Sequence, residues 1–157
     1  RLLVVALLSV AVPAAGLGRK APRTKEAAPV KSAADIAAVD ANPSEWKGSF
    51  CPEAAGSARV AATAAQWEKL WKDSLGKPAP EADFEKHFAV AVFLGTRNTG
   101  GYAVEFLTPR SDGKEVLIAY RVRKPGQGMF VIQAFTQPYH VKLFKKTSLT
   151  VRTVEEP

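Results

Sequence analysis

The chain is poor in the residues that build disulfides and metal centres. Among its 157 residues there are one cysteine, Cys51, and two histidines, His87 and His140. A single cysteine excludes a disulfide within the chain, so Cys51 is either buried and inert or paired with another chain. Two histidines do not supply a histidine-rich metal site. We therefore expect a fold held by its hydrophobic core, with no metal and no cofactor.

Motifs of several enzyme classes are also missing. The sequence has no GxSxG nucleophile elbow, no GxxxxGK[ST] phosphate loop and no HExxH zinc helix. Glu81, Asp83 and Glu85 alternate along one loop, whereas a paired-carboxylate hydrolase holds its two acids across a cleft. We expect a domain without enzymatic activity. The alternative is a small exported hydrolase or ligand-binding domain that uses His140 and this acidic loop.

Basic residues exceed acidic ones, but they are not concentrated. There are 22 Lys and Arg against 15 Asp and Glu, a net charge of +7. The basic clusters are short: Arg121 and Arg123 lie in one, Lys145 and Lys146 in the other. A nucleic-acid interface needs a denser basic patch with interleaved aromatic residues, so we expect no nucleic acid partner. Binding of an envelope polyanion by these four residues is a further alternative.

The first residues have the pattern of a targeting segment. Residues 1–16 begin with Arg1, continue with an apolar stretch over 2–12 and end in small residues, which is typical of a secretory signal peptide. The apolar stretch is short for a membrane span, and the leader has no cysteine for lipid attachment. We expect export to the periplasm, cell surface or medium, with no stable membrane span after cleavage. Residues 17–44, rich in Ala, Pro, Lys and Arg, predict a flexible linker, and 45–157 one folded domain.

One amphipathic helix is predicted over 63–75. Thr63 and Gln66 form a capping-box pattern at its start. Four apolar residues then fall on one stripe, and Gly76 ends the helix. These are Trp67, Leu70, Trp71 and Leu75.

The rest of the folded part has the alternation of strands. The strongest prediction is a β-hairpin over 88–107, with Phe88, Val90, Val92 and Leu94 on one face of its first strand and a glycine-containing turn at its centre. Further strands are expected at 47–51, 115–123, 129–136, 139–144 and 149–154, while 59–62 is expected to enter the helix. The predicted fold class is α+β: a mostly antiparallel β-sheet packed by one amphipathic helix.

Two short motifs place a tyrosine beside a backbone constraint, one after paired glycines and one after a proline. Tyr and Arg are favoured anchors of protein interfaces, and an edge strand beside a proline can accept a partner strand. The alternative is that both motifs serve only turns and packing. The candidate partner-binding residues are Arg97, Asn98, Thr99, Gly100, Gly101, Tyr102, Pro138, Tyr139 and His140.

Several stretches together resemble the PrcB C-terminal domain family. They are QWEKLW at 66–71, DF at 83–84, GTRNTGGY at 95–102 and QAFTQPYHV at 133–141. The family contains exported bacterial proteins and is named after an accessory subunit of a subtilisin-like surface protease complex. The resemblance implies a small α+β domain without a catalytic role of its own.

The resemblance and the tyrosine motifs together predict a function. We expect an exported, non-enzymatic domain that binds another exported protein, with a subtilisin-like protease as the partner that the family suggests. Its action would be stoichiometric, either stabilising or inhibiting the protease, through the turn at 97–102 and the Pro138-Tyr139 edge.

Overall fold

The computed structural model describes residues 44–157. The predicted signal peptide at 1–16, and the linker at 17–44 apart from Ser44, lie outside these residues. The described elements are β1 (Glu45–Gly48), β2 (Gly56–Ala61), α2 (Ala64–Leu70), the π-helical turn η1 (Trp71–Leu75), β3 (His87–Leu94), β4 (Ala103–Phe106), β5 (Arg110–Ser111), β6 (Glu115–Arg123), β7 (Tyr139–Lys145) and β8 (Thr150–Glu155).

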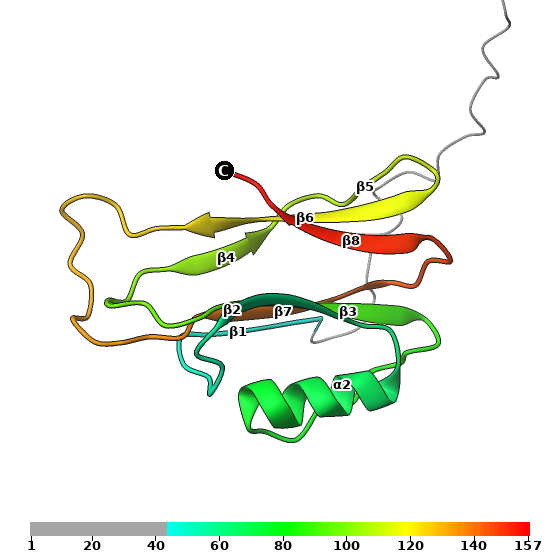
Figure 1. Ribbon diagram of the computed structural model, residues 1–157, viewed down its shortest axis with the longest axis horizontal. Helices are drawn as coiled ribbons and strands as arrows, with labels where there is room; N and C mark the ends of the chain where they lie inside the picture. The colour runs from blue at the N-terminus through cyan, green and yellow to red at the C-terminus, as the bar shows by residue number, and fades with distance from the viewer. Residues whose placement is uncertain (1–43) are drawn as a thin grey trace, which may run out of the picture.

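The strands form two stacked sheets with the helix on one outer face (Figure 1). The first sheet has the order β1-β7-β3-β2 and is antiparallel throughout. The second has the order β4-β6-β5, and β8 adds to β6 in parallel. The predicted fold class, a mostly antiparallel β-sheet with one packing helix, is confirmed. The division into two sheets was not predicted.

The strand β3 lies at the centre of the domain and is buried along its whole length. One face carries Phe88, Val90, Val92 and Leu94, which belong to the core between the two sheets. The opposite face belongs to a second core beneath the helix. The alternation predicted for this strand is therefore confirmed, with both faces apolar because both are covered.

The helix begins and ends where its capping residues predict. The Oγ1 of Thr63 accepts a hydrogen bond from the backbone N–H of Gln66, and the Gln66 side chain accepts one from Ala62 N–H. Gly76 ends the turn η1 in the left-handed conformation, with φ of 63°. These local contacts satisfy backbone groups that the helix itself leaves unpaired.

A cluster of three tryptophans fills the core beneath the helix. The ring centroids of Trp46, Trp67 and Trp71 lie 5.3–5.5 Å apart. The Trp67 indole N–H donates to the carbonyl of Pro80 at 2.8 Å. On the facing side of β3 the residues Ala89 and Ala91 are small, which leaves room for these rings.

The predicted hairpin over 88–107 is wrong. Its two strands are present as β3 and β4, but β3 pairs with β2 and β7, and β4 pairs with β6 in the other sheet. The backbone N–H and C=O groups on both edges of the buried strand β3 need hydrogen-bond partners, and the strands β2 and β7 provide them. The glycine-containing segment at 95–102 therefore crosses from one sheet to the other.

Two further segments differ from their predictions. Residues 129–136, expected as a strand, make only an isolated bridge between Thr136 and Arg97. Residues 59–61, expected to enter the helix, belong to the edge strand β2. By contrast, the strands expected at 115–123, 139–144 and 149–154 are present as β6, β7 and β8, and the one expected at 47–51 begins two residues earlier as β1.

The tryptophan cluster predicts a large effect of one substitution. Replacing Trp67 by Ala removes a buried ring and its hydrogen bond, so the free energy of unfolding falls by about 3–5 kcal/mol in urea titrations. The matched control is Lys69→Ala on the exposed face of the same helix, which changes it by less than about 0.5 kcal/mol. Equal effects of the two substitutions would contradict the packing described here.

Candidate protein-binding surface

Two crossovers between the sheets lie side by side at one end of the domain (Figure 1). The first crossover, residues 95–102, joins β3 to β4; the second crossover, residues 124–138, joins β6 to β7. The backbones of Arg97 and Thr136 exchange two hydrogen bonds of 2.8 and 2.9 Å, and Gly100 N–H donates to the carbonyl of Ile132 at 2.9 Å. The two crossovers therefore form one surface.

Gly101 is needed for the contact between the crossovers. Its φ of 85° lies in the left-handed region. A Cβ at this position would lie 2.8 Å from Val131 and 2.9 Å from Pro125, both in the second crossover. The paired glycines thus do more than turn the chain, because they let the second crossover lie against the first.

The second crossover exposes an unusual amount of apolar surface. Phe130 is fully exposed, and Phe135, Met129 and Ile132 are 67%, 63% and 56% exposed. Single exposed apolar residues are common, whereas four large ones within one short segment are typical of an interaction site. Sequence reasoning missed this surface because a short run of apolar residues also suits a strand. Pro125, Gly126 and Gly128 just before it were the available signal for a loop.

The six candidate residues of the first crossover differ in their exposure to solvent. Asn98 and Gly101 are exposed, Arg97, Thr99 and Tyr102 are half-buried and Gly100 is buried. The Arg97 guanidinium lies over the Tyr102 ring, 5.5 Å from its centroid. The Thr99 carbonyl accepts a hydrogen bond from the Thr136 hydroxyl at 2.9 Å.

The other three candidate residues lie inside the domain. Pro138, Tyr139 and His140 are all buried. The expectation of an edge at Pro138-Tyr139 is wrong, because β7 lies between β1 and β3. Tyr139 still comes near the first crossover: it lines, with Tyr102 and Lys47, a groove of about 210 Å³. This volume is below the roughly 300–1,000 Å³ of ordinary small-molecule pockets.

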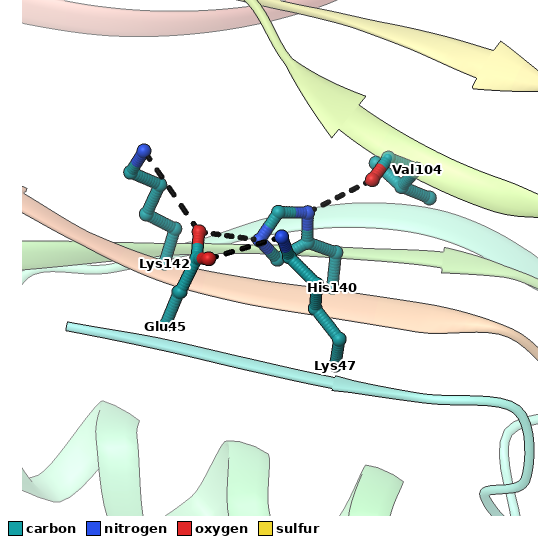
Figure 2. A network of polar contacts seen from close by, with 5 residues as sticks. All are labelled: Glu45, Lys47, Val104, His140 and Lys142. Atoms are coloured by element: carbon teal, nitrogen blue, oxygen red, sulfur yellow. Dashed lines mark hydrogen bonds and ion pairs between the residues drawn. The ribbon is translucent and has the colours of Figure 1, made fainter. Parts of the chain in front are cut away.

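His140 ties the two sheets together (Figure 2). Its Nδ1 lies 2.9 Å from the carbonyl oxygen of Val104 on β4, and its Nε2 lies 3.2 Å from a carboxylate oxygen of Glu45 on β1. Lys47 and Lys142 also contact the Glu45 carboxylate, at 3.0 and 3.9 Å. Because the Val104 carbonyl can only accept, Nδ1 donates to it.

The protonation of this network follows from burial. Burial among the two sheets holds the pKa of His140 below its ordinary value of 6.5, against the opposing contacts with Val104 and Glu45. The hydrogen bond from Lys47 lowers the pKa of Glu45 below its ordinary 4.5. Burial thus favours the uncharged form of the His140 ring, while Lys47 favours the carboxylate form of Glu45.

This geometry does not bring His140 to the acidic loop of the hydrolase alternative, and the carboxylate beside its ring is that of Glu45 instead. His140 pairs with Val92 in register, whereas the acidic loop precedes His87, at the other end of β3. The two are thus about 17 Å apart along the strand. The thiol of Cys51 donates to the Gln137 carbonyl at 3.4 Å, and burial raises the pKa of this thiol, so it is not activated.

The basic residues considered for polyanion binding do not form one patch. Arg121 and Arg123 both pair with Glu105, at 3.8 and 2.9 Å. Lys145 and Lys146 lie at the end of β7 remote from the crossovers, and the Lys146 ammonium donates to the Phe84 carbonyl. Within 44–157, no group of three potential metal ligands occurs.

The comparison with known families agrees with the resemblance seen in the sequence. Residues 88–144 match the family model described as PrcB C-terminal. The PrcB C-terminal match begins in β3 and ends in β7, so it includes both crossovers. No curated protein and no solved structure shows significant similarity to the chain. Among the residues that the structure describes, no helix is long and apolar enough to cross a bilayer.

The His140 network predicts a pH dependence of stability. The unfolded chain binds a proton at His140 more readily than the folded protein does. The contribution of His140 to the free energy of unfolding is therefore fully present at neutral pH and falls as the pH drops below 6.5. In His140→Gln, which does not titrate, this loss disappears. The slopes of the unfolding free energy between about pH 7 and 5.5 differ by at most about 1.4 kcal/mol per pH unit, the value for one proton.

The matched control for this prediction is the other histidine. His87→Gln keeps His140 and its contacts, so the loss of stability that is assigned to His140 remains in this variant. Urea unfolding of the three proteins across this pH range measures the difference. Parallel profiles for His140→Gln and the unchanged protein would contradict the assignment.

Proposed function

We propose that this chain is an exported accessory protein whose β-domain binds a secreted or surface protease. The observation that carries the proposal is the exposed apolar segment 129–135, which lies beside the first crossover and within the PrcB C-terminal match. Large exposed side chains on a backbone fixed by hydrogen bonds are suited to recognition of a protein. The family named after a protease accessory subunit suggests the class of partner.

The action that fits this surface is stoichiometric. Phe130 and Phe135 bury apolar area only when a partner covers them, and that burial is the main favourable term of association. The contacts that order the second crossover exist before binding, which lowers the entropic cost of association. The domain therefore binds as a rigid body and stabilises the protease, by the linkage that favours any bound folded state.

A double substitution in the second crossover tests the proposal. The full chain is immobilised and exposed to the secreted and envelope proteins of its native cell, and captured proteins are identified by mass spectrometry. We expect a protease among them, with recovery reduced about tenfold or more by Phe130→Ser/Phe135→Ser because two apolar anchors are lost.

The matched control removes exposed apolar surface elsewhere. Val60→Ser alters a partly exposed residue of β2 and leaves recovery of the protease unchanged. The purified protease is then heated with and without the chain, and a longer half-life of activity is the expected result. Absence of any protease from the proteins that depend on Phe130 and Phe135 would refute the proposal.

A further inference from the structure

Arg97 differs from every other arginine in the described part of the chain. The five other arginines at 44–157 each pair with a carboxylate: Arg59 with Glu53, Arg110 with Glu156, Arg121 and Arg123 with Glu105, and Arg152 with Glu115. Arg97 pairs with none of the acidic residues that the structure describes. Its charge is therefore not neutralised within residues 44–157.

Arg97 is also held in place. Its backbone is fixed by the two hydrogen bonds to Thr136, and its guanidinium stacks on the Tyr102 ring. The Nε of Arg97 is buried and has no hydrogen-bond partner in the described chain. A planar guanidinium that is already ordered binds a carboxylate with little further loss of side-chain freedom.

The surroundings of Arg97 favour an anion with an apolar neighbour. Neither crossover contains an Asp or Glu, and Lys124 adds a second positive charge at the start of the second crossover. Phe135 directly precedes Thr136, and Ile132 contacts Gly100, so exposed apolar side chains flank the bridge that fixes Arg97. Charge complementarity therefore requires a negative group on a partner that also covers these apolar side chains.

We propose that Arg97 receives the carboxylate of an Asp or Glu that is flanked by large apolar residues in the partner. This inference deepens the proposed function, since it specifies which surface of an exported protein the domain recognises. The carboxylate forms charge-assisted hydrogen bonds with the guanidinium, while its neighbours pack on Ile132 and Phe135. Arg97 thus sets the specificity of a surface whose apolar side chains supply most of the affinity.

A protein partner fits this surface better than a lipid membrane. Binding to anionic lipids by surface charge uses clusters of about four to eight basic residues. The two crossovers together have only Arg97 and Lys124. A single ordered arginine that stacks on a tyrosine is instead the arrangement of an interface anchor.

Selection from a library of random 12-residue peptides tests the inference with the full chain. We expect the unchanged protein to select peptides in which Asp or Glu adjoins Phe, Leu, Ile or Trp. Arg97→Gln loses the acidic preference, and its Kd for the consensus peptide rises about tenfold or more, as for a lost charged hydrogen bond. Arg97→Lys keeps the charge but not the planar fork, so its Kd is intermediate.

The matched control is Arg152→Gln, which removes an exposed arginine that pairs with Glu115 at 3.1 Å. It leaves both the consensus and the Kd unchanged. Selection of apolar peptides without acidic residues would overturn the inference, as would an acidic preference that Arg97→Gln retains. Binding to phosphatidylglycerol vesicles that depends on Arg97, without peptide selection, would overturn it in favour of a membrane.

The two proposals fail in different ways. If Phe130→Ser/Phe135→Ser abolishes capture of the protease but Arg97→Gln does not, the proposed function stands and the role of Arg97 is refuted. If the peptides show the acidic preference but no protease is captured, the role of Arg97 stands and the protease is not the partner.

Discussion

On β3, Phe88, Val90 and Val92 face the second sheet, while Ala89 and Ala91 lie beneath the helix. A strand buried on both faces must have its backbone paired on both edges, because an unpaired buried N–H or C=O is costly. The strands β2 and β7 meet that requirement. They also leave β4 without a place beside β3, so the second sheet and the two crossovers follow from this constraint.

The candidate surface is a consequence of the two-sheet arrangement. Each time the chain passes between sheets at this end, its backbone must leave one ladder before it enters the next. The two crossovers satisfy part of their backbone by pairing with each other, at Arg97 with Thr136 and Gly100 with Ile132. Apolar side chains that a ladder would have turned toward a core are instead presented to solvent. This is how an apolar sequence that suits a strand produces an exposed apolar surface.

His140 and Arg97 are two polar side chains that differ in burial and in their contacts. His140 is buried between the sheets, where Val104 and Glu45 contact its ring, and its role is to join β7 to β4 and β1. Arg97 lies at the surface, is ordered by Tyr102 and meets no acid in the described chain. The first group therefore contributes to the cohesion of the domain, and the second is available to a partner. Both belonged to the predicted site, and burial separates their roles.

The sequence by itself determined the features that depend on near neighbours along the chain. The cap at Thr63, the end at Gly76, the apolar stripe of the helix and the alternation of β3 and β6 are all local. Only the tertiary structure decided which strands pair, because pairing depends on which edges are already occupied. Residues 88–94 and 129–136 are both rich in apolar residues, as strands are. The first forms the central strand with a partner on each edge, whereas the second makes an isolated bridge to Arg97 and lies exposed. The family resemblance and the turn at 97–102 were therefore visible in the sequence, whereas the apolar half of the surface was not.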